Sequence, residues 1–162
     1  MKKVEEEKGK KTLKVTPIRD GIVIDHICAG KGIVVLDILG LPDPKHSSVV
    51  SAVMNVPSKQ EKRKDIIKIE DRILERQELD IISLIAPDAT INVIKNYEVV
   101  KKYKVHIPSV VKGIVRCGNP NCITNQREPV EPKFMVVSRE PVVLRCAYCE
   151  RKLTDIAGHL IR

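Results

Sequence analysis

The stretch RCGNPNC (residues 116–122), followed by RCAYCERKL (residues 145–153), decides how the last third of the chain folds. Each contains two cysteines, separated by four residues in the first stretch and by two in the second. Two such turns can present four thiolates at the corners of a tetrahedron, which is the geometry of structural zinc sites. The spacing therefore predicts one zinc ion bound by Cys117, Cys122, Cys146 and Cys149. Buried free cysteines, or a redox Cys-x-x-Cys pair, are the alternatives.

A site of four sulfur ligands predicts a structural and noncatalytic role for the metal. It leaves no coordination position for water or substrate, which a catalytic zinc normally keeps. About fifty residues follow Pro108, too few for a comfortable hydrophobic core without a metal. The fifth cysteine, Cys28, lies in an apolar stretch and is predicted to be a small core residue. The four histidines show no pattern of nucleophile and base.

The composition is that of a folded protein with a moderate basic excess. Of the 162 residues, 43% are hydrophobic and 31% are charged, and the formal net charge is +8. No run approaches the roughly 18 apolar residues of a membrane helix, and no apolar segment follows the first lysines, so we expect a cytoplasmic protein. Met1–Lys11 is predicted to be a flexible charged tail. A basic zinc-ribbon protein that binds nucleic acid is an alternative, which the aromatic content of 2% disfavours.

Hydrophobic patterns predict an α+β sandwich with helices on one face of its sheet. We expect a ferredoxin-like arrangement of an antiparallel sheet and two helices, followed by a small all-β zinc domain. The clearest helix is Glu75–Ala86, which Pro87 ends. Gly30–Leu41 fits either a strand or a helix with Ile33, Leu36 and Gly40 on its buried side. The predicted strands are Ile22–Ile27, Val49–Val56, Lys64–Glu70, Thr90–Lys95 and Tyr97–Val105. The predicted domains span residues 12–107 and 108–162.

Alternation assigns faces to two of these strands. Val50, Ala52, Met54 and Val56 should share one face of their strand. In the next strand Ile67 and Ile69 should point inward, with Lys64 and Lys68 on the opposite face. Another strand carries Lys101, Lys102 and Lys104, and a triphosphate would suit such a group of donors. Spacing alone favours a solvated role for all five lysines. Gly30-Lys31-Gly32 is weak as a phosphate loop, because it lacks the full Walker spacing.

Five segments together carry a family resemblance: GIVIDHICAGKG (21–32), RKDIIKIED (63–71), APDATINVIKNYEVV (86–100), CGNPNCIT (117–124) and LRCAYCER (144–151). In this order they resemble the regulatory chain of aspartate carbamoyltransferase. The resemblance implies a noncatalytic subunit whose N-terminal domain binds CTP as inhibitor and ATP as activator. It implies a C-terminal zinc domain that docks on the catalytic chain, and self-dimers, formed through the N-terminal domain, that bridge catalytic trimers. Neither nucleic acid nor membrane is an expected partner.

The same resemblance implies which residues bind the effector. Lys68 would lie near base and ribose and Lys102 near phosphate, which reverses the solvated interpretation of the lysines. Asp25 and His26 match the acidic and imidazole pair beside the nucleotide, and Lys64 is a weaker candidate. The base and ribose pocket would contain Val15, Ile18, Val23, Asn92, Ile94, Tyr97 and Val99. The chain departs from the family pattern at Thr16-Pro17 and at Cys28.

Overall fold

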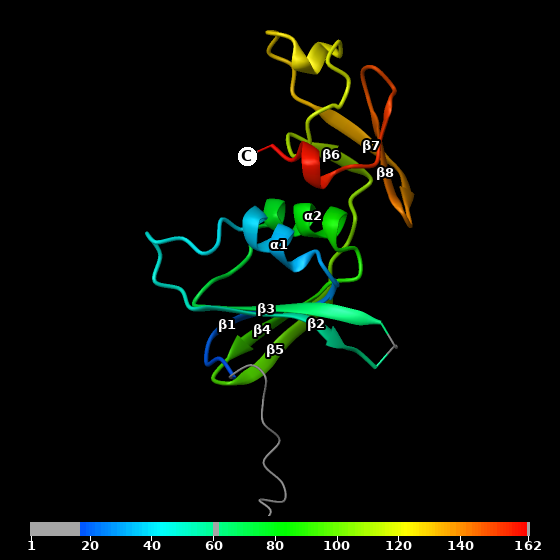
Figure 1. Ribbon diagram of the computed structural model, residues 1–162. Coiled ribbons are helices and arrows are strands. Elements are labelled where there is room, and N and C mark those ends of the chain that lie inside the picture. The colour runs from blue at the N-terminus through cyan, green and yellow to red at the C-terminus, as the bar shows by residue number, and fades with distance from the viewer. Residues whose placement is uncertain (1–16, 60–61, 162) are drawn as a thin grey trace, which may run out of the picture.

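A computed structural model of the protein describes residues 17–59 and 62–161. The predicted tail Met1–Lys11, together with Val15 and Thr16, lies outside this range. Figure 1 shows a sheet with two helices on one face, and a second, smaller sheet beyond the helices. The first part contains β1 (Gly21–Cys28), α1 (Gly32–Ile38), β2 (Val50–Pro57), β3 (Arg63–Glu70), α2 (Arg76–Ile85), β4 (Thr90–Lys95) and β5 (Glu98–Lys104).

The larger sheet has the strand order β2-β3-β1-β4-β5, and all of its neighbouring strands are antiparallel. Its first four strands and two helices follow each other as β-α-β-β-α-β, which is the ferredoxin-like arrangement. β5 extends this sheet at the edge beside β4. The predicted sandwich is therefore confirmed, with one strand added to the ferredoxin-like unit.

Alternating isoleucines form the sheet side of the core. Ile22 and Ile24 on β1 and Ile67 and Ile69 on β3 are buried under the helices, as the period of two requires. Helix α2 begins after Glu75, which forms a capping box with Glu78, and its C-cap is Ala86, directly before Pro87. The predicted helix and the inward faces of β3 are confirmed.

Two predictions on the chain around α1 are wrong in detail. Gly30–Leu41 does contain a helix, but the buried side holds Val35 and Leu39, whereas Ile33 is 64% exposed. Cys28 is exposed and not a core residue. A bulge explains the second error, because the register of β1 shifts between Ile24 and Ile27 and so changes the face of every later residue.

Strand β2 follows the predicted alternation only as far as its bulge. It lies at the edge of the sheet, and its register shifts between Val53 and Val56. Asn55, inside this bulge, has a φ of 58°. Val50 and Ala52, before the bulge, pair with Ile69 and Ile67 and so share the helix-side face as predicted. Val56, after the bulge, pairs with Lys64 and lies on the other face. An edge strand with a bulge buries little on either face, so its apolar pattern was a poor guide to orientation.

The connection between β4 and β5 is tighter than predicted. Asn96 and Tyr97 both have positive φ, of 49° and 65°. They form the two-residue turn of a hairpin, the geometry that matches the twist of antiparallel strands. Asn96 is therefore a turn residue as predicted, whereas Tyr97 belongs to the turn and not to the strand, which begins at Glu98.

The C-terminal part is all-β, as predicted, apart from two short 3-10 turns. Its sheet has the order β6-β7-β8-β9. The elements are β6 (Val110–Lys112), the 3-10 turn η1 (Ile123–Asn125), β7 (Lys133–Arg139), β8 (Val142–Cys146), β9 (Lys152–Leu153) and the 3-10 turn η2 (Ala157–His159).

The two parts share one hydrophobic core. A single cluster of buried side chains runs from the isoleucines of the larger sheet through Ile107 and Val111 to Phe134 and Leu144. The connecting segment is held from the C-terminal side, because Arg139 Nη1 donates a hydrogen bond of 2.7 Å to the carbonyl of Ile107. Within residues 17–59 and 62–161, no helix has the length and apolar character needed to cross a membrane.

Candidate functional site

The four predicted metal ligands come from two turns at one end of the smaller sheet. Cys117 follows an isolated bridge between Val115 and Leu160, and Cys122 directly precedes η1. Cys146 is the last residue of β8, and Cys149 lies in the turn that leads to β9. The structure thus brings together cysteines that are up to 32 residues apart in the sequence.

The spacing of the sulfur atoms fits one metal ion. All four Sγ atoms lie within 4.8 Å of one another. Cys117 Sγ is 3.5 Å from Cys149 Sγ, and Cys122 Sγ is 3.7 Å from Cys146 Sγ. A tetrahedron with metal–sulfur distances of about 2.3 Å has edges of about 3.8 Å. The four cysteines could therefore hold a metal ion with little movement.

Hydrogen bonds fix both turns around this centre. Asn125 Nδ2 donates to the carbonyls of Cys117 and Asn119, at 2.8 and 2.6 Å. The hydroxyl of Thr124 donates to Cys122 Sγ at 3.2 Å. In the second turn the amide of Glu150 donates to the carbonyl of Cys146 at 3.0 Å. Such bonds to ligands and their backbone orient a metal site and tune its basicity.

The thiols differ in acidity. Burial raises the pKa of Cys117 to about 12 and also raises the pKa of Cys146. Burial is also the largest influence on Cys149 and acts to raise its pKa. Hydrogen bonds from the backbone amide of Arg151, from the Asn119 side chain and from the neighbouring cysteines together outweigh burial, and the pKa falls to about 7. At neutral pH Cys117 and Cys146 are therefore protonated unless a cation binds. All four become thiolates together only when a metal supplies the compensating charge.

We expect metal affinity to fall steeply with acidification. Protons compete with the metal for at least two thiols whose pKa is raised, so each pH unit below neutrality should weaken binding at least about 100-fold. Competition with a chromophoric chelator at several pH values measures this slope. A change of less than tenfold per unit would show that fewer than two thiols bind protons when the metal leaves.

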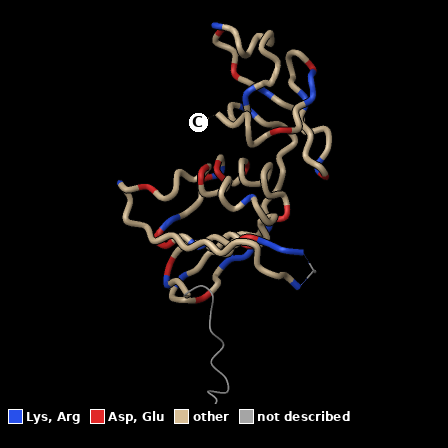
Figure 2. The backbone as a smooth tube through the Cα atoms, viewed as in Figure 1, with Lys and Arg blue, Asp and Glu red and all other residues tan. Residues whose placement is uncertain are grey.

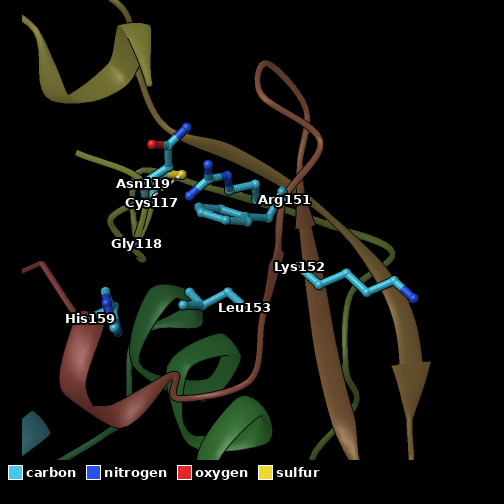
Figure 3. Close-up of a pocket in the computed structure, with 8 residues that line it drawn as sticks. Cys117, Gly118, Asn119, Arg151, Lys152, Leu153 and His159 are labelled. Carbon is cyan, nitrogen blue, oxygen red and sulfur yellow. Dashed lines mark hydrogen bonds between the residues drawn. The ribbon is translucent and has the colours of Figure 1, made fainter. Parts of the chain in front are cut away.

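A cavity of about 290 Å³ adjoins the first cysteine turn. It is lined by Cys117, Gly118, Asn119, Phe134, Arg151, Lys152, Leu153 and His159. Figure 3 shows Asn119 and Arg151 together beside Cys117, His159 on the opposite side, and Lys152 pointing away. The cavity offers an amide and a guanidinium group next to the metal centre, so it suits an acidic group.

Most of the predicted effector residues lie on the face of the larger sheet that the helices leave uncovered. The strand register aligns four of them in one row, in which Lys68 pairs with Val23, Val23 with Asn92, and Asn92 with Lys102. Directly paired residues of adjacent strands point to the same face. Two lysines therefore flank an amide and a valine across four neighbouring strands. We refer to these four residues as the cross-strand row.

The predicted acidic and imidazole pair lies beside this row. Asp25 Oδ1 is 2.9 Å from Lys64 Nζ, which brings the weaker candidate Lys64 into the same group. His26 is exposed in the β1 bulge with a φ of 57°, and its amide donates to Asp25 Oδ1 at 2.6 Å. The bulge thus turns the imidazole away from the core while its neighbour stays on the uncovered face.

The apolar candidates gather toward the β4–β5 turn. Ile94 pairs with both Gly21 and Val99, and Ile18 lies over Gly21. Tyr97 is 67% exposed, and its amide donates to the carbonyl of Arg19 at 3.0 Å. Val15, the remaining candidate, is outside the described residues. The structure therefore places a polar row and an apolar end on one face.

At least one lysine on this face is less solvated than an ordinary surface lysine. Desolvation lowers the pKa of Lys68, so its ammonium is partly withdrawn from water. Lys104 is not among the effector residues that the resemblance implies, although it lies two residues after Lys102 on the same strand and pairs with Thr90, which pairs with Asp25. Figure 2 shows basic and acidic residues interspersed in both parts of the chain, which argues against one uniformly basic surface.

Comparison with known proteins decides the family. Residues 13–106 match the family model for the aspartate carbamoyltransferase regulatory chain, allosteric domain, and residues 109–157 match the metal binding domain of the same chain. The chain belongs to the aspartate carbamoyltransferase regulatory chain family. Both matched domains are regulatory, and neither is catalytic.

Several curated regulatory chains cover nearly the whole sequence. The one from Thermoplasma volcanium is 55% identical over 90% of this chain and 95% of its own length. The one from Pyrococcus furiosus is 54% identical over 88% and 93%. The one from Methanocella arvoryzae is 53% identical over 94% and 99%. All three carry the name aspartate carbamoyltransferase regulatory chain.

The glycine loop of this regulatory chain has an internal partner. The amides of Gly30 and Gly32 donate to Asp65 Oδ2 at 3.0 and 2.8 Å. These donors are directed toward the chain's own carboxylate, which explains why the loop resembles an anion-binding motif. Two of its amides are therefore not available to a phosphate, and the loop belongs to the scaffold of the larger sheet.

Proposed function

We propose that the chain is the regulatory subunit of an aspartate carbamoyltransferase, with CTP as inhibitor and ATP as activator binding to the uncovered face of the larger sheet. The observation that supports this most directly is the cross-strand row of Lys68, Val23, Asn92 and Lys102. Two ammonium groups suit phosphates and a ribose hydroxyl, and the amide can hydrogen-bond a base.

The other predicted effector residues complete the proposed site. Asp25, His26 and Lys64 would surround the polar end of the nucleotide, and Lys104 extends the basic edge toward the triphosphate. Ile18, Ile94, Tyr97 and Val99 would enclose the base and ribose, with Val15 from the segment before the described residues. A nucleotide has a flat, less polar base at one end and highly charged phosphates at the other. The uncovered face likewise has an apolar end and a basic end.

We further propose that the metal is zinc, one ion per chain. The four sulfur ligands of Cys117, Cys122, Cys146 and Cys149 favour a soft or borderline metal over magnesium or calcium, and their tetrahedral spacing is that of zinc. Such a zinc ion would hold the C-terminal part folded and supply no catalytic position.

The proposed domains are residues 12–107 for the effector and 108–162 for docking on the catalytic chain in the cytoplasm. Exposed Ile123 and Tyr148 each directly follow or precede a cysteine of the cluster and offer apolar contacts to a partner. The cavity beside Cys117 adds the guanidinium group of Arg151. Self-association through the N-terminal domain is supported by its edge strand β5, where Val99 and Val100 are exposed.

The test of the function is a reconstituted enzyme. We expect the purified chain to form a complex with the catalytic subunit of its own organism and to show no carbamoyl transfer by itself. CTP should then lower, and ATP should raise, the rate of carbamoyl transfer by the complex at subsaturating aspartate. A regulatory coupling of typical size changes an affinity about 5- to 150-fold.

The outcomes against the proposal are distinct. A complex whose rate is unchanged by both nucleotides would remove the effector assignment and leave the family intact. Turnover by the regulatory chain alone would contradict the noncatalytic role. Binding to DNA or RNA with a steep salt dependence, and no saturable CTP binding, would favour the nucleic-acid alternative instead.

A further inference from the structure

One buried carboxylate lies outside both proposed sites. Asp65, on the helix side of β3, has no exposed surface. Besides the amides of Gly30 and Gly32 on Oδ2, it accepts a hydrogen bond of 2.8 Å from the amide of Asn55 on Oδ1. Its two oxygens thus serve two different segments, the loop before α1 and the bulge of β2. The side chain ties both segments to β3.

The preceding residue points to the other face of the same strand. Lys64 is on the uncovered face and forms the ion pair with Asp25, since consecutive strand residues alternate between faces. Both strands that flank β3 shift their register here, β1 between Ile24 and Ile27 and β2 between Val53 and Val56. The Lys64–Asp25 pair of the proposed effector face and the loop before α1 therefore lie on opposite faces of the same end of the sheet, where both register shifts occur.

Helix α1 connects this end of the sheet to the C-terminal part. α1 packs against α2 and β3. Asp37, Ile38 and Gly40, in α1 and just after it, line a cavity of about 270 Å³ together with Ile81 of α2 and Leu160 and Ile161 near the C-terminus. A cavity at a contact between elements leaves room for a small relative movement. A shift of α1 would therefore change its contacts with the C-terminal segment that contains Leu160 and Ile161.

We propose that Asp65 is a positioning residue for regulation, which fixes the start of α1 to β3 so that an effector acting on the Lys64–Asp25 pair shifts α1 against the C-terminal part. This inference rests on the proposed function and names how that site is regulated. It does not place Asp65 in contact with the nucleotide, because the side chain lies on the opposite face of the sheet.

The substitution Asp65→Asn tests the proposal with minimal change in shape. All three partners of Asp65 are backbone N–H donors. An amide side chain has only one acceptor oxygen, and its NH₂ group would face a donor. The variant should therefore release either the loop before α1 or the β2 bulge, while the cross-strand row on the other face is kept.

The experiment uses the complete chain, free and assembled with its catalytic partner. We expect calorimetry to give a CTP affinity of free Asp65→Asn within about 3-fold of wild type. In the assembled enzyme, the ratio of half-saturating aspartate with and without CTP should fall toward one. A purely structural role would lower the melting temperature and leave this ratio unchanged. Exposed Asp88 supplies the matched control Asp88→Asn, which should behave as wild type.

A second variant covers the case in which Asp65→Asn does not fold. In Gly32→Ala the new Cβ would lie 2.8 Å from Asp65 Oδ2 and 3.0 Å from its Cβ, so the loop must move while the carboxylate remains. The same loss of the CTP effect is expected. A wild-type complex that ignores CTP overturns the proposed function. A responsive wild type with an equally responsive Asp65→Asn or Gly32→Ala variant overturns only the role of Asp65.

Discussion

Replacing Cys149 by Ser is expected to abolish metal binding and to unfold the C-terminal sheet. Structural zinc sites in small peptides contribute about 10–16 kcal/mol of binding free energy, which exceeds the stability of most small domains. In the sheet that carries the ligands, β6 and β9 have only three and two residues, so we expect a metal to be needed to hold the two cysteine turns together. Metal content by mass spectrometry and hydrogen exchange in β6–β9 measure the two effects.

Cys28→Ser is the matched control for this prediction. Cys28 is also a cysteine, but it is exposed and lies in the larger sheet, away from the four ligands. Metal content and exchange should remain at their wild-type values. The wild-type protein after chelation should behave as Cys149→Ser and should no longer co-migrate with catalytic trimers. Continued co-migration of the metal-free chain would show that docking does not need the metal.

Replacing Lys102 by Ala is expected to weaken CTP binding about 10- to 100-fold, with little change for cytidine. A hydrogen bond from a charged group to phosphate contributes about 1.5–3 kcal/mol, and each 1.4 kcal/mol is a factor of ten. Lys102 ends the cross-strand row at the exposed edge strand, so its ammonium can follow the phosphates. Calorimetry with CTP and with cytidine on the full chain separates the two contributions.

Lys101→Ala provides the control on the same strand. Lys101 pairs with Val93, so it lies on the other face of β5, where its ammonium is 5.2 Å from the ring centre of Tyr103. Removing it takes away the same charge from the same edge, and the affinity for CTP should change less than about threefold. Equal losses for CTP and cytidine in Lys102→Ala, or equal losses in both variants, would remove Lys102 from the phosphate role.

The features that sequence predicted correctly are those fixed by local spacing. The four cysteines were found because a tetrahedral metal needs paired ligands on two turns, and the spacing is visible without a structure. Helix α2 was found from its apolar stripe, its acidic first turn and Pro87. The inward faces of β3 followed from strict alternation. In each case the chemistry of a few neighbouring residues determines the result.

The features that sequence did not predict depend on partners far along the chain. The bulges of β1 and β2 are set by pairing with β3. Each reverses the face of the residues that follow it, which explains the errors at Cys28 and Val56. Asp65 meets Gly30 across 35 residues. The row that aligns Lys68 with Lys102 requires the register of four strands. The resemblance to the family named these lysines, whereas spacing alone favoured a solvated face.

The unbroken cluster of buried side chains has a consequence for the modularity of the chain. The family is described by two separate domains, and the sequence has a natural boundary at Pro108, but Ile107 and Val111 on either side of it belong to the same cluster. A chimera that joined the first half of this chain to the second half of a relative would therefore need compatible side chains across the junction. The two halves can be inherited as separate modules. Unfolding of the second half should nevertheless expose part of the shared cluster and so lower the melting temperature of the first.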